Sequence, residues 1–121
     1  MQQFEINTDH VDGYTVIAAR GEIDVDTSVP LRETIAQSVV EGHVHLVIDL
    51  TEVTFIDSTG LGALLGGRRR AHSLEGSFKV VCEHPTVLRM FMITGLDAVV
   101  SIHGSLDAAV ASPPTPDPVD E

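Results

Sequence analysis

The chain has 121 residues, of which 43% are apolar and only 4% aromatic, and it carries a net charge of −11 at pH 7. This length fits a single domain with an aliphatic core, and 18 acidic residues against seven Lys and Arg disfavour binding to nucleic acid or to an anionic membrane surface. Residues 1–6 lack the basic and apolar regions of a signal peptide, and no apolar run approaches the ~20 residues of a membrane helix. We therefore expect a cytoplasmic protein with no membrane partner.

The first third of the chain predicts two strands and a helix. Apolar and polar residues alternate over residues 4–8, as in a half-buried strand, and residues 14–20 form a second run of strand length. The turn signal Asp12-Gly13 between them predicts an antiparallel hairpin, with a loop that looks longer than two residues. The next segment has the caps, apolar face and stop of a helix. These are Asp26, Thr27 and Ser28 as candidate caps, Leu31, Ile35 and Val39 as the face, and Glu41-Gly42 as the stop.

The rest of the chain alternates strands with helices. Residues 45–50 are apolar enough for a central strand covered on both faces, and a helix is expected from about Ser58. The later elements are a strand at residues 78–82, a helix that begins near Pro85 and stops at Gly95, a short strand at residues 99–102 and a last helix capped by Ser105. Cys82, the single cysteine, excludes an internal disulfide, and its place in an apolar strand predicts a structural thiol.

The end of the chain differs in composition from the rest. Residues 112–121 hold four of the six prolines and no large apolar residue, so we expect a disordered tail after a domain of residues 1–111. The order β-β-α-β-α-β-α-β-α predicts an α/β domain. Its sheet would be mixed and mainly parallel, with four to five strands covered by about four α-helices.

The turn after the central strand, Asp57-Ser58-Thr59-Gly60, carries the most distinctive polar residues. An acid, two hydroxyls and a glycine are typical of a helix start, because short polar side chains accept hydrogen bonds from unpaired N–H groups. A strand that leads into a capped helix places this turn at the rim of the sheet, where α/β folds tend to have their sites. Asp24 follows another strand and is expected nearby.

The helix after this turn contains many glycines and ends in a run of arginines. Gly60, Gly62, Gly66 and Gly67 indicate either close approach of a partner or tight packing on the sheet, and both interpretations stay open. The run Arg68-Arg69-Arg70 fits a solvated helix end that complements the helix dipole. A contact with an acidic partner is its alternative interpretation.

The sequence indicates no enzymatic site. The six histidines are scattered and form no metal-binding pattern, although His43 and His45 would share one strand face. The surroundings of Ser58 lack the Gly-x-Ser-x-Gly turn of a hydrolase nucleophile, and the chain has no Gly-x-x-x-x-Gly-Lys phosphate-binding loop. We therefore expect no catalytic residues, no metal and no cofactor.

Two roles remain for Ser58, a helix cap or a hydroxyl that a kinase modifies. A phosphate adds about −1.5 to −2 charge, which the N-terminus of a helix tolerates. A partner docked there would have to desolvate that charge beside Asp57 and Asp24, so modification would act by repulsion. From physical chemistry alone, a cap is the commoner role of such a serine.

Four stretches resemble the STAS domain family, in particular the stand-alone bacterial anti-sigma factor antagonists. The stretch at residues 55–62, Phe-Ile-Asp-Ser-Thr-Gly-Leu-Gly, resembles the family signature. Gly21-Glu22-Ile23-Asp24 resembles the Gly-Glu-Leu-Asp that follows the second strand of the family. Residues 80–82 and the segment through Arg89, Phe91, Gly95 and Leu96 resemble its later strand and helix. The similarity spans about residues 4–110.

The resemblance implies a STAS-like fold and a partner-switching function in transcription regulation. The unphosphorylated protein would bind an anti-sigma factor that is also a serine kinase, and would thereby free a sigma factor. The kinase would phosphorylate Ser58 with its own ATP to switch binding off, and a PP2C-type phosphatase would restore it. The residues implied at the partner contact are Asp24, Asp57, Ser58, Thr59, Gly60, Leu61 and Gly62.

Two other functions stay open. Some STAS domains are constitutive adaptors in transport or lipid-transport complexes and use the same surface without phosphorylation. A hydrolase with Ser58 as nucleophile is the alternative from a different class of protein.

Overall fold

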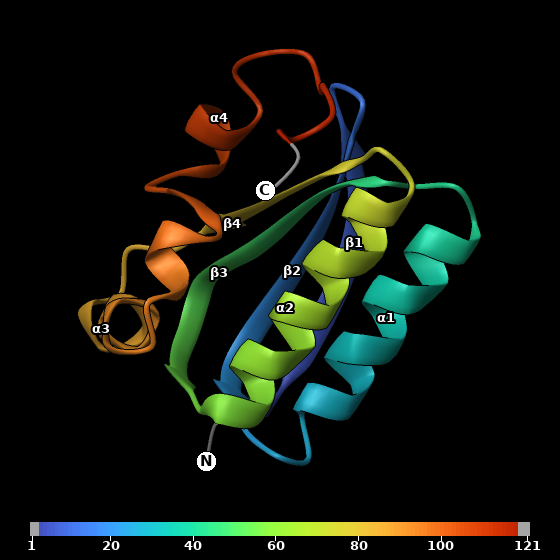
Figure 1. Cartoon of the computed structure of the whole chain (residues 1–121). Helices are drawn as coiled ribbons and strands as arrows, with labels where there is room; N and C mark the ends of the chain where they lie inside the picture. Colours follow the sequence, from blue (N-terminus) through green and yellow to red (C-terminus); the bar gives the residue numbers. More distant parts are fainter. Residues whose placement is uncertain (1–2, 119–121) are drawn as a thin grey trace.

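A computed structural model describes residues 3–118 as a five-stranded sheet with helices packed on it (Figure 1). The strands are β1 (Glu5–Val11), β2 (Tyr14–Ile23), β3 (His45–Ile56), β4 (Ser77–Val81) and β5 (Ser101–His103). The helices are α1 (Ser28–Val40), α2 (Ser58–Ser73), α3 (Pro85–Ile93) and α4 (Leu106–Ala109), with a 3₁₀ helix, η1 (Leu96–Ala98), before β5. The element order that the sequence predicts is therefore confirmed, and η1 is an addition to it.

The sheet is mixed and mainly parallel, as predicted. Its strand order is β1-β2-β3-β4-β5, in which β1 and β2 are antiparallel and the other neighbouring pairs are parallel. The hairpin loop is shorter than the sequence led us to expect, because Val11 pairs with Tyr14 and leaves only Asp12 and Gly13 in the turn. Both turn residues have positive φ, 51° and 89°, as a type I′ turn requires. An Asp-Gly pair meets that requirement at low cost.

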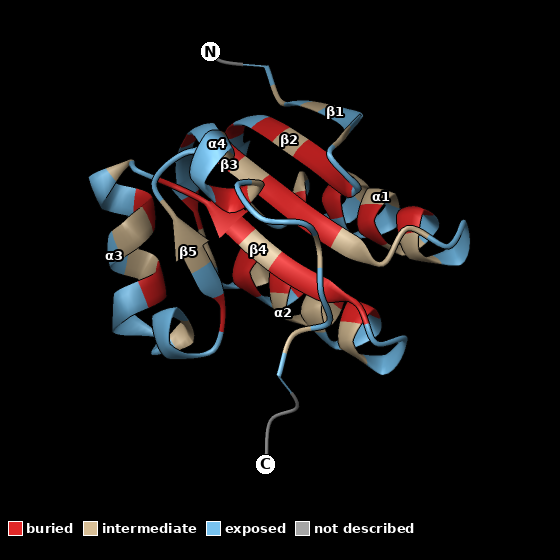
Figure 2. Cartoon of the chain, turned by 90° about the horizontal axis from the view of Figure 1, so that it is seen from above, coloured by how far each residue is buried: buried red, intermediate tan, exposed pale blue. Residues whose placement is uncertain are grey.

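Two apolar clusters lie on the two faces of the sheet. The larger one joins α1, α2 and α3 to the sheet and includes Leu31, Leu64 and Phe91. The smaller one joins α4 to the opposite face through Ala109, Tyr14 and Val16. The strand β4 is buried along most of its length, and β3 is buried chiefly over residues 46–50 (Figure 2). Cys82 lies in the larger cluster, where burial raises the pKa of its thiol, and it is the structural thiol that the sequence predicts.

Several strand boundaries differ from the predicted ones. The strand β3 runs to Ile56 instead of Leu50, because residues 52–56 still pair with β2 through irregular register steps, and only Val53 and Ile56 of this extension are buried. A search for a continuous apolar run cannot find such an extension. The strands β1 and β2 each end three residues later than predicted, at Val11 and Ile23. The starts of β4 and β5 shift by one and two residues, to Ser77 and Ser101.

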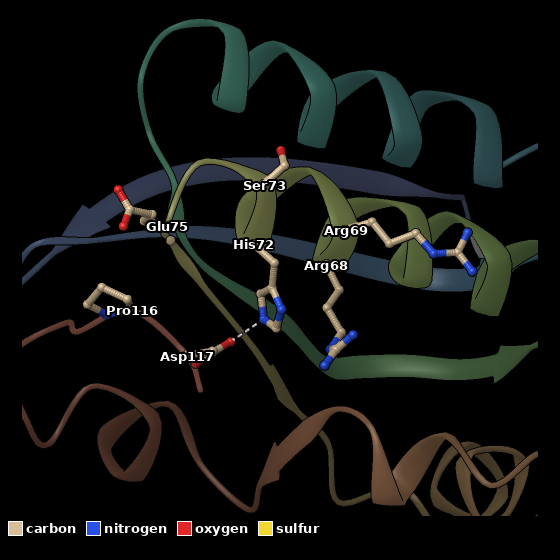
Figure 3. A pocket seen from close by; sticks show the side chains of 8 residues that line it. Arg68, Arg69, His72, Ser73, Glu75, Pro116 and Asp117 are labelled. Carbon is tan, nitrogen blue, oxygen red and sulfur yellow. Dashed lines mark hydrogen bonds and ion pairs between the residues drawn. The ribbon is translucent and has the colours of Figure 1, made fainter. Parts of the chain in front are cut away.

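The described part of the tail lies against the domain. The Tyr14 hydroxyl donates a hydrogen bond to the Ser112 carbonyl, 3.0 Å, and Asp117 contacts both α2 and the start of β4 (Figure 3). Disorder of residues 112–121 in solution stays a prediction, and residues 119–121, like residues 1–2, lie outside the described part. No helix within residues 3–118 has the length and apolar character needed to cross a membrane.

Candidate binding surface at the start of α2

The loops after β2 and β3 meet at one edge of the sheet. These strands are parallel neighbours, and their last pairs are Glu22 with Phe55 and Ile23 with Ile56. The backbone N–H of Asp57 donates to the Ile23 carbonyl, 3.1 Å, which ties the two loops together. Asp24 and Asp57 therefore lie in adjacent loops, as the sequence led us to expect.

Asp57, and not Ser58, is the N-cap of α2. Its Oδ1 accepts hydrogen bonds from the backbone N–H groups of Thr59, 2.9 Å, and Gly60, 3.2 Å. The interpretation of Ser58 as a cap is thus wrong by one residue. Since the helix begins at Ser58, this serine is the first helical residue and its side chain has no capping role.

Asp24 is held in a compact hydrogen-bonded loop. Its Oδ1 accepts from the backbone N–H groups of Asp26 and Thr27, both 3.0 Å. The Thr27 hydroxyl accepts from the Asp24 backbone N–H, 2.8 Å, and donates to the Glu22 carbonyl, 2.7 Å. Thr27 is the N-cap residue of α1 but makes no side-chain cap bond, so the predicted side-chain cap is absent. The first N–H groups of the helix bind backbone carbonyls instead, Ser28 N–H to Asp24, 2.8 Å, and Val29 N–H to Asp26, 3.3 Å.

Ser58 and Thr59 differ in what their hydroxyls do. The Thr59 hydroxyl donates to Asp57 Oδ1, and Thr59 is half-buried. Ser58 is exposed, and within residues 3–118 its hydroxyl makes no hydrogen bond. Of the two adjacent hydroxyls, the one on Ser58 is therefore available to another molecule.

Of the three residues Gly60, Leu61 and Gly62, two pack against the sheet and one lies at the surface. A Cβ on Gly60 would lie 2.6 Å from a methyl of Ile23 and 2.7 Å from Ile56, so this glycine permits close packing of α2 on the sheet. Leu61 is only 3% exposed and belongs to the core. Gly62 is exposed with open space at its Cβ position. Among these three, Gly62 alone is placed for a partner contact.

Exposed apolar side chains flank the acids, and the sequence analysis missed them. Val25 is 62% exposed, Val29 42% and Phe55 41%. Each lies within a few residues of Asp24 or Asp57. Apolar side chains beside charged ones are a common composition of protein-binding surfaces. Val25 directly follows Asp24 and Phe55 lies two residues before Asp57, but the sequence analysis did not place either of them at the partner contact.

Hydrogen bonding keeps both carboxylates ionised. The Thr59 hydroxyl, followed by the Gly60 and Thr59 N–H groups, lowers the pKa of Asp57, against the opposing effects of burial and of the Asp24 charge. The Thr27 N–H is the largest cause that lowers the pKa of Asp24, and burial opposes it. The surface thus presents fixed negative charge next to the free Ser58 hydroxyl.

Two substitutions of Asp57 distinguish the effect of its helix cap on stability from the effect of its charge. We expect Asp57→Ala to lower the free energy of unfolding by about 0.5–2 kcal/mol, because two N–H groups lose their acceptor, whereas Asp57→Asn keeps a good cap and most of the stability. Urea unfolding of both variants measures this. Equal losses in the two variants would contradict the role of Asp57 as a cap.

The lowered pKa values also predict a pH dependence. A carboxyl whose pKa is lower in the folded protein than its ordinary value of 3.8 stabilises the fold above that value. The stabilisation disappears as the pH falls through the folded pKa. We expect the Asp24→Asn, Asp57→Asn double variant to lose less stability than the native chain between about pH 5 and pH 2. Parallel stability curves over that range would show that these two groups do not contribute.

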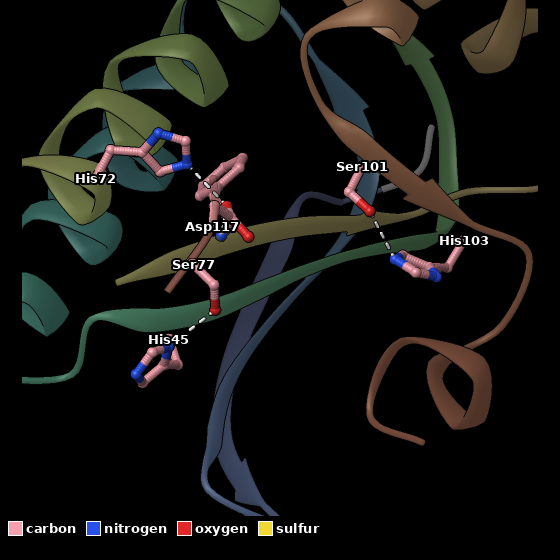
Figure 4. Close-up of polar contacts among 7 residues, drawn as sticks. His45, His72, Ser77, Ser101, His103 and Asp117 are labelled. Carbon is pink, nitrogen blue, oxygen red and sulfur yellow. Dashed lines mark hydrogen bonds and ion pairs between the residues drawn. The ribbon is translucent and has the colours of Figure 1, made fainter. Parts of the chain in front are cut away.

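The histidines do not assemble into a metal site. His45 Nδ1 lies 2.9 Å from the Ser77 hydroxyl and His103 Nε2 lies 2.9 Å from the Ser101 hydroxyl (Figure 4). The His43 ring instead stacks against His10, with 4.8 Å between ring centroids. In the part of the chain that the structure describes, no cluster of three or more His, Cys, Asp or Glu side chains could hold a metal ion.

These features define a small α/β domain with a candidate binding surface at the carboxyl ends of β2 and β3, and comparisons with known proteins identify the family. The STAS domain family model matches residues 5–109. The anti-sigma-B factor antagonist of Listeria monocytogenes is 35% identical over 98 residues, which are 81% of this chain and 82% of that protein. The crystal structure of an anti-sigma factor antagonist from Mycobacterium paratuberculosis superimposes with a TM-score of 0.79 at 31% identity, covering 90% of this chain and 92% of that one. The anti-sigma factor antagonist SpoIIAA in its unphosphorylated form, at 19% identity and a TM-score of 0.68 over 90% of this chain and 94% of that one, shares the fold. The chain belongs to the STAS domain family.

Proposed function

We propose that this protein is an anti-sigma factor antagonist whose binding is switched off by phosphorylation of Ser58. The curated relative from Listeria and the structural relative from Mycobacterium both have names of this kind, and the similarity covers most of each chain. The unphosphorylated surface would bind an anti-sigma factor that also acts as a serine kinase, and a sigma factor would be released.

The free, exposed hydroxyl of Ser58 is the observation that supports this proposal. A kinase can reach it without opening the domain, because the hydroxyl holds no internal hydrogen bond in the described residues. The cap of α2 depends on Asp57 instead, so modification of Ser58 leaves the helix start intact. The first turn of the helix also tolerates added negative charge.

Phosphorylation would act at the surface and not on the fold. A phosphate brings about −1.5 to −2 charge into a site that already holds the ionised carboxylates of Asp57 and Asp24. A partner that covers Val25, Phe55 and Ser58 would have to desolvate three adjacent negative groups. Like charges brought together in an interface cost several kcal/mol, which is enough to release a partner.

The resemblance to the anti-sigma factor antagonists supplies the remaining parts of the proposal. The chain would provide the phosphate acceptor, the kinase would bring the ATP, and a PP2C-type phosphatase would remove the phosphate. Both partners would meet the protein in the cytoplasm. The alternative, a constitutive adaptor in a transport or lipid-transport complex, would keep its partner whether or not ATP is present.

Capture of partners from the native cell with and without ATP tests the proposal. We expect the immobilised chain to retain the anti-sigma factor, an ATPase of the histidine-kinase-like type that acts as a serine kinase, in the absence of ATP and to release it when ATP is supplied. Mass spectrometry should then find phosphate on Ser58, and the Ser58→Ala chain should retain the ATPase under both conditions. Retention of membrane transport components that is insensitive to ATP would favour the adaptor instead.

A further inference from the structure

A second surface lies at the opposite end of the sheet from Ser58, where the C-terminal segment returns to the domain. The strand β5 pairs with β4 only from Lys79 onward, although β4 begins at Ser77. The backbone of Phe78 is therefore left without a strand beside it on that side. Asp117 takes this place, since its Oδ2 accepts from the Phe78 N–H, 2.9 Å.

The same segment is bound through two further contacts. The Asp117 N–H donates to the Gly76 carbonyl, 3.0 Å, and Asp117 Oδ2 lies 2.7 Å from His72 Nε2 on α2. The side chains of His72 and Asp117 are only 19% and 23% exposed. Arg68 and His72 are one helical turn apart and both side chains point from α2 toward the segment (Figure 3). The Asp117 carboxylate thus links α2 to the first residues of β4, which have no strand beside them on that side.

The surroundings of Asp117 have the shape and charge of a site for an acidic chain. Cavities of about 420 Å³ and 250 Å³ lie on its two sides, and Arg68 and His72 line both of them. Arg69 also lines the larger cavity, together with the exposed acid Glu75, whereas Arg70 lines neither of the two cavities. The segment that reaches it is acidic, because three of its last five residues are Asp or Glu.

We infer that the trough between the last turns of α2 and the start of β4 binds an extended acidic peptide, and that residues 115–118 of the same chain are its occupant. Pro116 and Pro118 on either side of Asp117 restrict the free segment, which lowers the entropy lost when it is ordered. The segment is also guided toward the trough by Pro114, which packs against Gly13, and by the bond from the Tyr14 hydroxyl to Ser112.

A peptide supplied in trans tests this inference in the full-length chain. A short tether gives an effective concentration of about 1 mM, so an occupied trough must bind the free segment with a Kd below that value. We expect a synthetic peptide of residues 112–121 to shift the NMR amide signals of Gly76 and Phe78 in the Asp117→Ala chain. The native chain should need at least about tenfold more peptide, because its own segment competes.

Two matched variants define the specificity. A peptide with Asn in place of Asp117 keeps an acceptor for the Phe78 N–H but loses the charge, and we expect it to bind at least about tenfold more weakly. Addition of His72→Ala to the Asp117→Ala chain should weaken binding of the native peptide by a similar factor, while the remaining amide signals show that the domain is folded. The inference would be overturned by the absence of any shift at about 5 mM peptide. Equal responses of the native and Asp117→Ala chains would overturn it as well.

Discussion

Ser58→Asp is expected to weaken binding of the anti-sigma factor at least about tenfold, equivalent to about 1.4 kcal/mol. Asp at this position adds a third carboxylate beside Asp24 and Asp57, and a docked partner must desolvate all three. Ser58→Asn is the matched control, because it has nearly the same size without the charge. Titration calorimetry with the captured partner measures both variants.

The comparison of these two variants distinguishes charge from shape. We expect Ser58→Asn to retain most of the affinity of the native chain and to resist the kinase. If Asn weakens binding as much as Asp does, repulsion between charges is not the cause, and the switch must depend on steric fit at the start of α2. Unchanged affinity in both variants would place the partner elsewhere on the domain.

Gly76→Ala is expected to cause the largest loss of stability, about 3 kcal/mol or more. A Cβ on Gly76 would lie far inside van der Waals contact with the carbonyl oxygen of Val44. That same carbonyl accepts from the Ser77 N–H, 3.0 Å, and backbone on both sides is held by strand pairing. Rotation of a side chain therefore cannot relieve the steric clash between the new methyl group and the Val44 carbonyl oxygen.

Gly66→Ala is the control for this substitution. Gly66 lies within α2, and nothing lies within 4 Å of its Cβ position. Alanine there should raise the free energy of unfolding by up to about 1 kcal/mol, since glycine is a poor helix former. Thermal or urea unfolding measures both variants, and a Gly76→Ala chain as stable as the native one would contradict the close approach of the two backbones.

The closeness of Asp24 and Asp57 at the candidate binding surface could be predicted because it depends on topology. Parallel neighbouring strands end at the same edge, so the loops that contain Asp24 and Asp57 had to meet once the strand order was correct. The role of Ser58 could not be obtained in this way. The side chains of Asp57, Ser58 and Thr59 are all short and polar, so each of them suits an N-cap. A shift of one residue in the start of α2 therefore decides which of them is the cap and which is exposed.

Other features depend on contacts that the local sequence does not encode. The extension of β3 beyond Leu50 relies on irregular pairing with β2. The exposure of Val25 and Phe55 depends on which side of the loop after β2, and of the end of β3, faces the core. The contacts of Asp117 join parts of the chain 39 and 45 residues apart, to Phe78 and His72, and a proline-rich composition gives no sign of them. Only the packed structure brings these groups together.

The central claim is tested most directly by the affinity of one purified chain for the captured anti-sigma factor before and after phosphorylation of Ser58. We expect saturable binding of the unphosphorylated chain, at least about tenfold weaker binding of the phosphorylated chain, and full recovery once a phosphatase removes the phosphate. Mass spectrometry of the same samples confirms which residue is modified. Equal affinity of the two forms, with Ser58 fully phosphorylated, would contradict the proposed switch.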